Sequence, residues 1–241
     1  MPLEPRSFRA AGWIGIVGAL ATAVSDLALQ YTPEASHLAS RDYLYLLDVA
    51  PGRLLLGHFL GVFGILLEIA GFWQVSLGLR PAGRVPARSF FFLSAGTFAL
   101  GTAFHAMFAP IGLALHALQE TGAAPALLSA VAAAVRPAHQ GLGAVILTGI
   151  AALSLLFSWL VVFRPTLYPR WMALCSPLPL ALFFLLLTRF SLTLRLVLLP
   201  CGLNLANLVL FGLSTAVLGR ARDARPGTAG SSAARSRPSS G

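Results

Sequence analysis

Long apolar stretches separated by short polar ones form the main pattern of this chain. Six of the stretches are predicted to be helices, at residues 10–29, 54–79, 89–109, 139–163, 171–188 and 196–218. A helix rises ~1.5 Å per residue, so about 20 apolar residues cross the ~30 Å hydrocarbon core of a bilayer. The pattern therefore predicts an all-α polytopic membrane protein, a bundle of six transmembrane helices.

The remaining segments are expected to lie outside these helices. Residues 111–135 hold two more apolar stretches, each too short to cross a bilayer, and we interpret them as an interfacial or re-entrant segment. Pro177 and Pro179 are expected to bend the fifth helix. Residues 219–241 are rich in Arg, Ser, Gly and Pro, and predict a disordered cytoplasmic tail after a membrane domain spanning residues 1–218.

Composition agrees with this pattern. Hydrophobic residues make up 57% of the 241 residues and charged residues only 10%, whereas a soluble domain carries about 25% charged residues. All seventeen basic residues are arginine, and they punctuate the apolar stretches instead of forming a patch interleaved with aromatic residues. The lipid bilayer is therefore the expected partner, and nucleic acid is not.

The arginines also predict an orientation. Twelve of the seventeen lie in the N-terminal lead, the second and fourth loops and the tail, and five lie in the other three loops. Cytoplasmic loops of membrane proteins carry the excess of positive charge. We therefore expect a multi-pass protein of the plasma (inner) membrane, with both termini in the cytoplasm.

Polar residues inside the apolar stretches are the candidate functional residues. Seven are predicted to line a polar pocket: Asp26, His58, Glu68, His105, His139, Asn204 and Asn207. Ionisable groups are costly within a bilayer, so they usually face the bundle interior and one another. Most of the seven fall toward the outer ends of their helices, and Glu68 lies deeper, about 15 Å beyond His58. The pocket is therefore expected to open to the outer face.

Three interpretations of the pocket remain open. It binds or transports a small polar ligand or ion, with Asp26 and Glu68 as proton carriers. Alternatively, Asp26, His58, His105 and His139 bind zinc in a metal-dependent membrane hydrolase, although no two histidines have the spacing of a zinc motif on one helix. In the third interpretation, the polar groups only hold the helices together. No catalytic residue is assigned, because no GxSxG turn occurs and Ser25, beside Asp26, has no evident base.

Glycines recur at intervals of seven in the second predicted helix, at Gly57, Gly64, Gly71 and Gly78, with Gly61 between them. Such spacing places them on one helix face, where a neighbouring helix can approach closely. We interpret this series as a packing seam.

Three segments carry a family resemblance: GWIGIVGALATAVSDLAL, PGRLLLGHFLGVFGILLEIAGFWQVSLGLRPAG and GTAFHAMFAPIG, with a weaker similarity at PCGLNLANLVLFG. They resemble an uncharacterised bacterial family of multi-pass membrane proteins, a domain of unknown function, mainly over residues 12–112. The resemblance implies an integral membrane protein and supplies no activity, substrate or cofactor.

Overall fold

The computed structural model describes residues 5–33, 35, 38 and 43–223, and every regular element within them is a helix. The α-helices are α1 (Pro5–Gln30), α3 (Pro51–Gly78), α4 (Arg84–Ala106), α5 (Phe108–Glu120), α6 (Pro125–Phe163), α7 (Pro177–Leu187) and α8 (Leu192–Asp223). Short 3-10 helices lie between them: η1 (Tyr43–Asp48), η2 (Arg80–Ala82) and η3 (Arg170–Cys175). The all-α prediction is confirmed.

Five segments of the described chain are long and apolar enough to cross a membrane: Phe8–Gln30, Pro51–Gly78, Arg84–Glu120, Pro125–Phe163 and Leu192–Arg220. Helix α7 is apolar but has only 11 residues, and about 20 are needed to cross alone. Five of the six predicted spans thus have a counterpart of sufficient length. The remaining crossing, at residues 171–188, stays a prediction.

Residues 111–135 are not separate from the fourth predicted helix. They form α5 and the first part of α6, which turn back on each other at Gly122 (φ 76°). Helix α6 continues through Pro137 for 39 residues, so it begins at Pro125 and not at 139. A proline removes one helical hydrogen bond, but well-packed helices of membrane proteins tolerate this loss.

The third and last predicted helices also have different bounds. Helix α4 ends at Ala106, and Met107 separates it from α5, near Pro110, which has no amide hydrogen to donate. Pro177 does not bend a continuous helix; it begins α7, a position that suits its fixed φ. Helix α8 extends from Leu192 to Asp223 and includes the start of the predicted tail; the rest of that tail lies outside the described residues.

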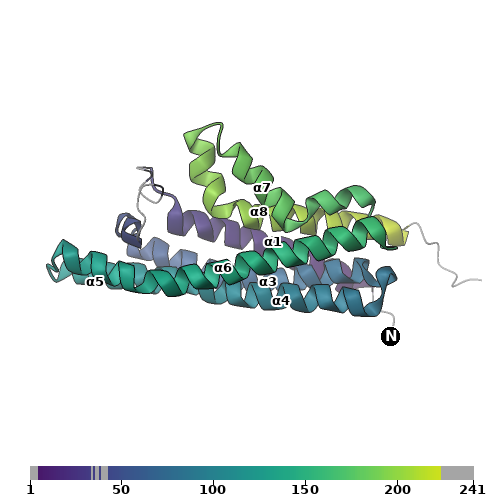
Figure 1. The fold of residues 1–241 in the computed structure, drawn as a ribbon, viewed down its shortest axis with the longest axis horizontal. Helices are drawn as coiled ribbons and strands as arrows, with labels where there is room; N and C mark the ends of the chain where they lie inside the picture. The colour runs from purple at the N-terminus through teal and green to yellow at the C-terminus, as the bar shows by residue number, and fades with distance from the viewer. Residues whose placement is uncertain (1–4, 34, 36–37, 39–42, 224–241) are drawn as a thin grey trace, which may run out of the picture.

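The helices run alternately along one long axis (Figure 1). Helix α1 packs most extensively against α3 and α8, α3 packs against α4, and α4 packs against α6. Helix α7 pairs with α8 in a hairpin that diverges from the other helices, and α1 begins at the same end of the bundle at which α8 finishes. The main apolar core lies between α1, α3, α4, α6 and α8 and is rich in phenylalanine, including Phe72, Phe90, Phe157 and Phe211.

The contact between α1 and α3 depends on glycine. A Cβ atom on Gly18 would lie 2.6 Å from the carbonyl oxygen of Gly64, and one on Gly71 would lie 2.9 Å from the Phe211 ring. The side chain of His105 occupies the space over Gly61, and that of Leu29 the space over Gly57. The predicted glycine seam is therefore a surface of close helix approach.

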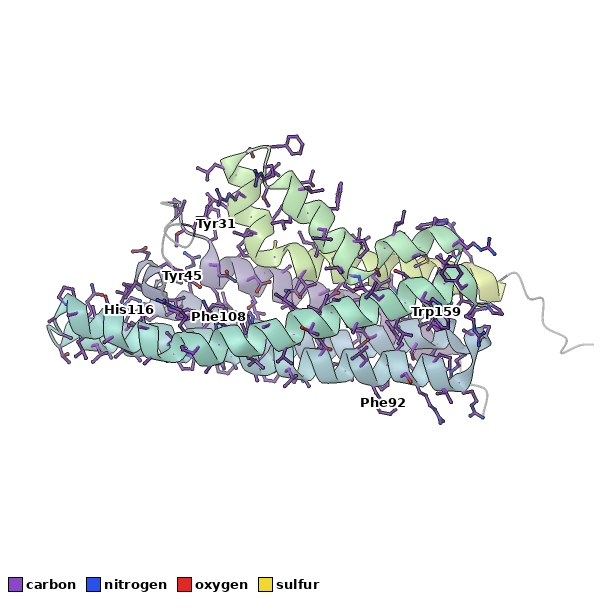
Figure 2. All side chains as sticks on the ribbon, in the orientation of Figure 1. Tyr31, Tyr45, Phe92, Phe108, His116 and Trp159 are labelled. Atoms are coloured by element: carbon purple, nitrogen blue, oxygen red, sulfur yellow. The ribbon has the colours of Figure 1, made fainter. Side chains whose placement is uncertain are left out.

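A second apolar cluster lies at the end of the bundle opposite the one at which α1 begins. Leu46 and Val49, from η1 and its C-terminal flank, pack with Phe108 and Leu115 of α5. Figure 2 shows Tyr45, Phe108 and His116 toward this end, together with Tyr31, whereas Phe92 and Trp159 lie toward the other. At ~1.5 Å per residue, the 39 residues of α6 extend ~58 Å, which is longer than a hydrocarbon core of ~30 Å.

Candidate ligand-binding site

A cavity of about 250 Å³ lies between the helices. It is lined from α1 by Thr22, Asp26 and Gln30, from α3 by Ile65, from α4 and α5 by Thr97, Phe98, Gly101, Phe104, His105 and Phe108, from α6 by Gly143, Ile146, Leu147 and Ile150, and from α8 by Pro200, Leu203 and Asn204. Most of the wall is apolar. Among the described residues that line it, Asp26 and His105 are the only ionisable side chains, so the polarity of the cavity is concentrated where these two meet.

The cavity opens sideways between two helices. Helix α6 packs on α4 and α8 packs on α1, whereas α6 and α8 make little contact with each other. Leu147 of α6 lines the cavity and is nevertheless 64% exposed. The opening therefore faces the outer surface of the bundle, which in a membrane is the side facing lipid.

Asp26 is held by two other helices. Its Oδ2 accepts a hydrogen bond of 2.6 Å from Nδ2 of Asn204 on α8, and its Oδ1 lies 3.6 Å from Nδ1 of His105 on α4. All three residues are at least nine-tenths buried. The sequence placed them in one pocket, and the structure brings these three together.

His105 reaches α1 through its other ring nitrogen. Nε2 lies 2.7 Å from Oγ of Ser25, and Ser25 itself donates a hydrogen bond to the carbonyl oxygen of Gly57. Because the serine proton is used for Gly57, its oxygen accepts from His105, and Nε2 must carry the hydrogen. In a neutral ring, Nδ1 then presents a lone pair to Asp26.

Two acceptors facing each other at 3.6 Å repel unless one of them carries a proton. The Asp26–His105 pair therefore holds one proton beyond the Nε2 hydrogen, on either residue. The pair is net neutral in both cases, as a neutral acid with a neutral imidazole or as a carboxylate with an imidazolium.

Glu68 and Asn207 form a second carboxyl–amide pair. Nδ2 of Asn207 on α8 donates to Oε2 of Glu68 on α3 at 2.6 Å, and both side chains are fully buried. The other two atoms of the pair, Glu68 Oε1 and Asn207 Oδ1, have no hydrogen-bond partner among the residues that the structure describes. Neither residue lines the cavity, so the structure separates this pair from the pocket in which the sequence placed it.

His139 belongs to a different group of contacts. Its ring stacks on Phe104 with centroids 3.8 Å apart, Nε2 donates to the Phe104 carbonyl oxygen at 3.2 Å, and Nδ1 accepts from the Tyr43 hydroxyl. Burial raises the pKa of Tyr43, so its hydroxyl keeps the proton that it donates. Both ring nitrogens of His139 are satisfied in the neutral state, so this residue ties η1 and α4 to α6.

Replacing Tyr43 by Phe is expected to cost about 1 kcal/mol of stability, because His139 loses its donor in a largely buried position. The change is measured as a lower midpoint of thermal unfolding in detergent. Tyr31→Phe is the matched control, since Tyr31 is exposed and no described residue forms a hydrogen bond with its hydroxyl. Equal midpoints for the two variants would contradict a stabilising hydrogen bond from Tyr43 to His139.

His58 lies apart from both groups. It is half-buried and contacts the ring of Phe59, and no described residue forms a hydrogen bond with its Nδ1. No group of three or more His, Cys, Asp or Glu side chains in the described residues is arranged to hold a metal ion. The four residues considered as zinc ligands are therefore not gathered into a zinc site, and the geometry gives that hypothesis no support.

Ser25 acquires a base that the sequence did not reveal. One ring nitrogen of His105 contacts Ser25 and the other contacts Asp26, which is the spatial arrangement of a serine hydrolase triad. Ser25 is, however, fully buried, does not line the cavity, and its proton is donated to Gly57. It therefore positions His105 and is not placed to attack a ligand in the cavity. Its separation of 80 residues from His105 gave no sequence signal.

A bundle of long apolar helices with carboxyl, imidazole and amide groups buried between them is the architecture of polytopic membrane proteins with an internal polar site. The chain belongs to the Family of unknown function (DUF6796), which matches residues 6–220. The resemblance to a domain of unknown function is confirmed, and it extends well past residue 112. No curated protein and no solved structure matches the chain.

Proposed function

We propose that this chain is an integral membrane protein that binds a small amphipathic molecule in the cavity between α1, α4, α6 and α8. The observation that carries the proposal is the wall of the cavity, apolar except for a few polar groups that include Asp26, His105 and Asn204. Such a wall is typical of ligand sites, where a few polar groups fix the orientation of a largely apolar molecule.

The polar end of the ligand is expected to be uncharged. Because Asp26 and His105 share one proton, the pair is net neutral and offers hydrogen bonds without a net charge to neutralise. A charged head group would have to leave water without an opposite charge to meet, which is costly. A hydroxyl or amide group suits the site better, and the lateral opening suits a molecule that arrives from the lipid.

The orientation that we propose follows the arginines. Arg80, Arg84 and Arg88 lie in the turn from α3 to α4, and Arg164 and Arg170 lie between α6 and α7, at the end where α1 begins and α8 finishes. We propose that this end faces the cytoplasm, because cytoplasmic loops carry the excess of positive charge. Six passes of the plasma membrane, with η3 and α7 together as the fifth, keep both termini on that side. The cavity then lies toward the outer half.

The test uses a long-chain alcohol that carries a photoreactive diazirine, with the protein in nanodiscs of neutral lipid. Adducts are expected on α6 and α8 at the cavity, on Ile146, Leu147 or Leu203, and an unlabelled alcohol is expected to compete for them. The alkane of equal length is expected not to compete, because it lacks the group that bonds to Asp26 and His105. Labelled peptides are identified by mass spectrometry.

Variants distinguish the cavity from general lipid contact. His105→Ala is expected to reduce the specific adducts several-fold, and Leu147→Trp is expected to block the opening. His58→Ala is the matched control, since His58 does not line the cavity. Adducts spread evenly over all lipid-facing helices, or equal competition by alcohol and alkane, would contradict the proposal.

Transport is a second function with its own supporting observation. Two carboxyl groups, on α1 and on α3, both bond to asparagines one helical turn apart on α8, so a movement of α8 would change both proton sites. A transporter would show ligand-coupled proton uptake in vesicles that is lost in Asp26→Asn. Ligand binding without proton movement would contradict transport and support binding as the function.

A further inference from the structure

A second hollow lies at the end of the bundle opposite the η1 cluster, on the turn from α3 to α4. It has a volume of about 340 Å³ and is lined by Arg80, Arg84 and Arg88, by Trp73, Phe91 and Phe92, and by Ser76 and Ala87. We call this hollow the arginine groove. It shares no lining residue with the cavity that contains Asp26.

The three arginines create an unbalanced positive charge. Arg84 and Arg88 are one turn apart on α4 and repel each other, and Arg80 lies across the turn in the same groove. All three are exposed, and within the part of the chain that the structure describes no carboxylate forms an ion pair with them. An anion in the groove would remove this repulsion.

The backbone adds further positive potential. Helix α4 begins at Arg84 after Gly83, and no side chain caps the amides of Arg84 and Val85; Pro86 has no amide hydrogen, and the Ala87 amide donates to the Gly83 carbonyl. Unpaired amides at a helix start, together with the helix dipole, favour a phosphate group. Gly83 has φ 124° and its Cβ would lie 3.3 Å from Pro86, so a residue with a side chain is disfavoured there.

The rim of the groove is aromatic. Trp73 and Phe91 are partly exposed, and Phe92 is 67% exposed and points away from the bundle (Figure 2). Tryptophan and arginine at the end of an apolar helix are typical of the level of lipid head groups, and basic pockets between helices bind anionic head groups. The combination suits a molecule that carries both a phosphate and acyl chains.

We propose that the arginine groove is a binding site for an anionic phospholipid, with the phosphate held by the three arginines and the acyl chains lying against Phe91 and Phe92. The site is independent of the ligand proposed for the Asp26 cavity. It lies in the leaflet on the arginine-rich side of the bundle and anchors the α3–α4 turn there.

The experiment compares phosphatidylglycerol with phosphatidylcholine bound to the whole chain. Protein from micelles containing both lipids is examined by native mass spectrometry, and the wild type is expected to retain phosphatidylglycerol in preference. The triple variant Arg80→Gln, Arg84→Gln, Arg88→Gln is expected to bind it on the order of a hundredfold more weakly, since each arginine near an anionic surface contributes about fivefold.

The matched control replaces Arg164, Arg170 and Arg220 by Gln. These arginines are exposed, the change in net charge is the same, and none lines the groove. Phosphatidylglycerol binding is expected to persist in this control. An equal loss in both triple variants, at unchanged thermal stability, would show only general attraction to anionic lipid and would overturn the proposal.

Two further arms identify the source of the phosphate. Inorganic phosphate at millimolar concentration is expected to displace phosphatidylglycerol poorly, and Phe92→Ala is expected to weaken binding of the lipid several-fold while leaving any binding of inorganic phosphate unchanged. If inorganic phosphate binds as tightly as the lipid, or if phosphatidylcholine is retained equally, the groove is not a site for anionic phospholipid.

Discussion

Gly18→Ala is expected to disrupt the packing of α1 on α3. The new Cβ would lie 2.6 Å from the carbonyl oxygen of Gly64 and 2.8 Å from the amide nitrogen of Glu68. Both are backbone atoms of α3, so no side-chain rotation relieves the contact and the two helices must separate. Overpacking of this kind costs about 1–3 kcal/mol, occasionally more.

The measurement is the midpoint of thermal unfolding in detergent, together with the fraction of monodisperse protein in size-exclusion chromatography. Gly96→Ala on α4 is the matched control, because nothing lies within 4 Å of its Cβ position. Alanine favours a helix over glycine by up to ~1 kcal/mol, so this control should unfold at the same or a higher temperature. If Gly18→Ala is as stable as the control, α1 and α3 do not pack as described.

The sequence predicted the helices with unbroken apolar stretches and misjudged those that contain proline. The second predicted helix, 54–79, corresponds to α3 within a few residues, since its 28-residue run is interrupted by neither proline nor a polar cluster. The fourth helix was predicted to begin at residue 139, but it begins at Pro125 and contains Pro137. A proline ends an isolated helix, whereas neighbouring helices can support one that continues through it.

Depth along a helix was predictable, but the direction of a side chain was not. His58 and His105 were placed at similar depths, yet only His105 meets Asp26. The face of α3 that meets α1 and α4 is marked by Gly57 and Gly61, and one residue in a helix turns by about 100°. His58 is one residue past Gly57, so it lies to the side of that face and not on it.

The division of the polar residues into separate groups also needed the structure. Asn204 and Asn207 are three residues apart on α8, and the sequence assigned them to one pocket. They bond to carboxylates on different helices, Asn204 to Asp26 and Asn207 to Glu68. Which of two carboxyl groups an amide meets depends on the crossing of three helices, and no local pattern records that crossing.

Glu68 is expected to carry a proton. As a carboxylate it would accept from Asn207 through Oε2 and leave both Oε1 and Asn207 Oδ1 without a donor. The Thr22 hydroxyl lies beside this group, but its proton is donated to the Gly18 carbonyl at 3.0 Å. A single proton on Oε1 converts the pair to a neutral acid and an amide, which can form two hydrogen bonds with each other.

Glu68→Gln is therefore expected to leave stability within ~1 kcal/mol of the wild type, since glutamine supplies the donor that the neutral acid supplies. Glu68→Ala is expected to cost about 3 kcal/mol, because it strands a buried amide and opens a cavity. Both changes are measured as shifts in the midpoint of thermal unfolding. Equal losses for the two variants would indicate a charged carboxylate.

Infrared spectroscopy separates the protonated acid from the carboxylate directly. A carbonyl stretch of a protonated carboxyl group is expected in the wild type, weaker in Glu68→Gln and unchanged in Glu120→Gln, which changes an exposed glutamate. Asp26 adds to the same band only if it holds the proton that it shares with His105, so Asp26→Asn identifies its part. A band that persists in Glu68→Gln and disappears in Asp26→Asn would show that Asp26 is protonated and that Glu68 is a carboxylate. In that case, another group at the contact between α3 and α8 would have to donate a hydrogen bond to Oε1 of Glu68.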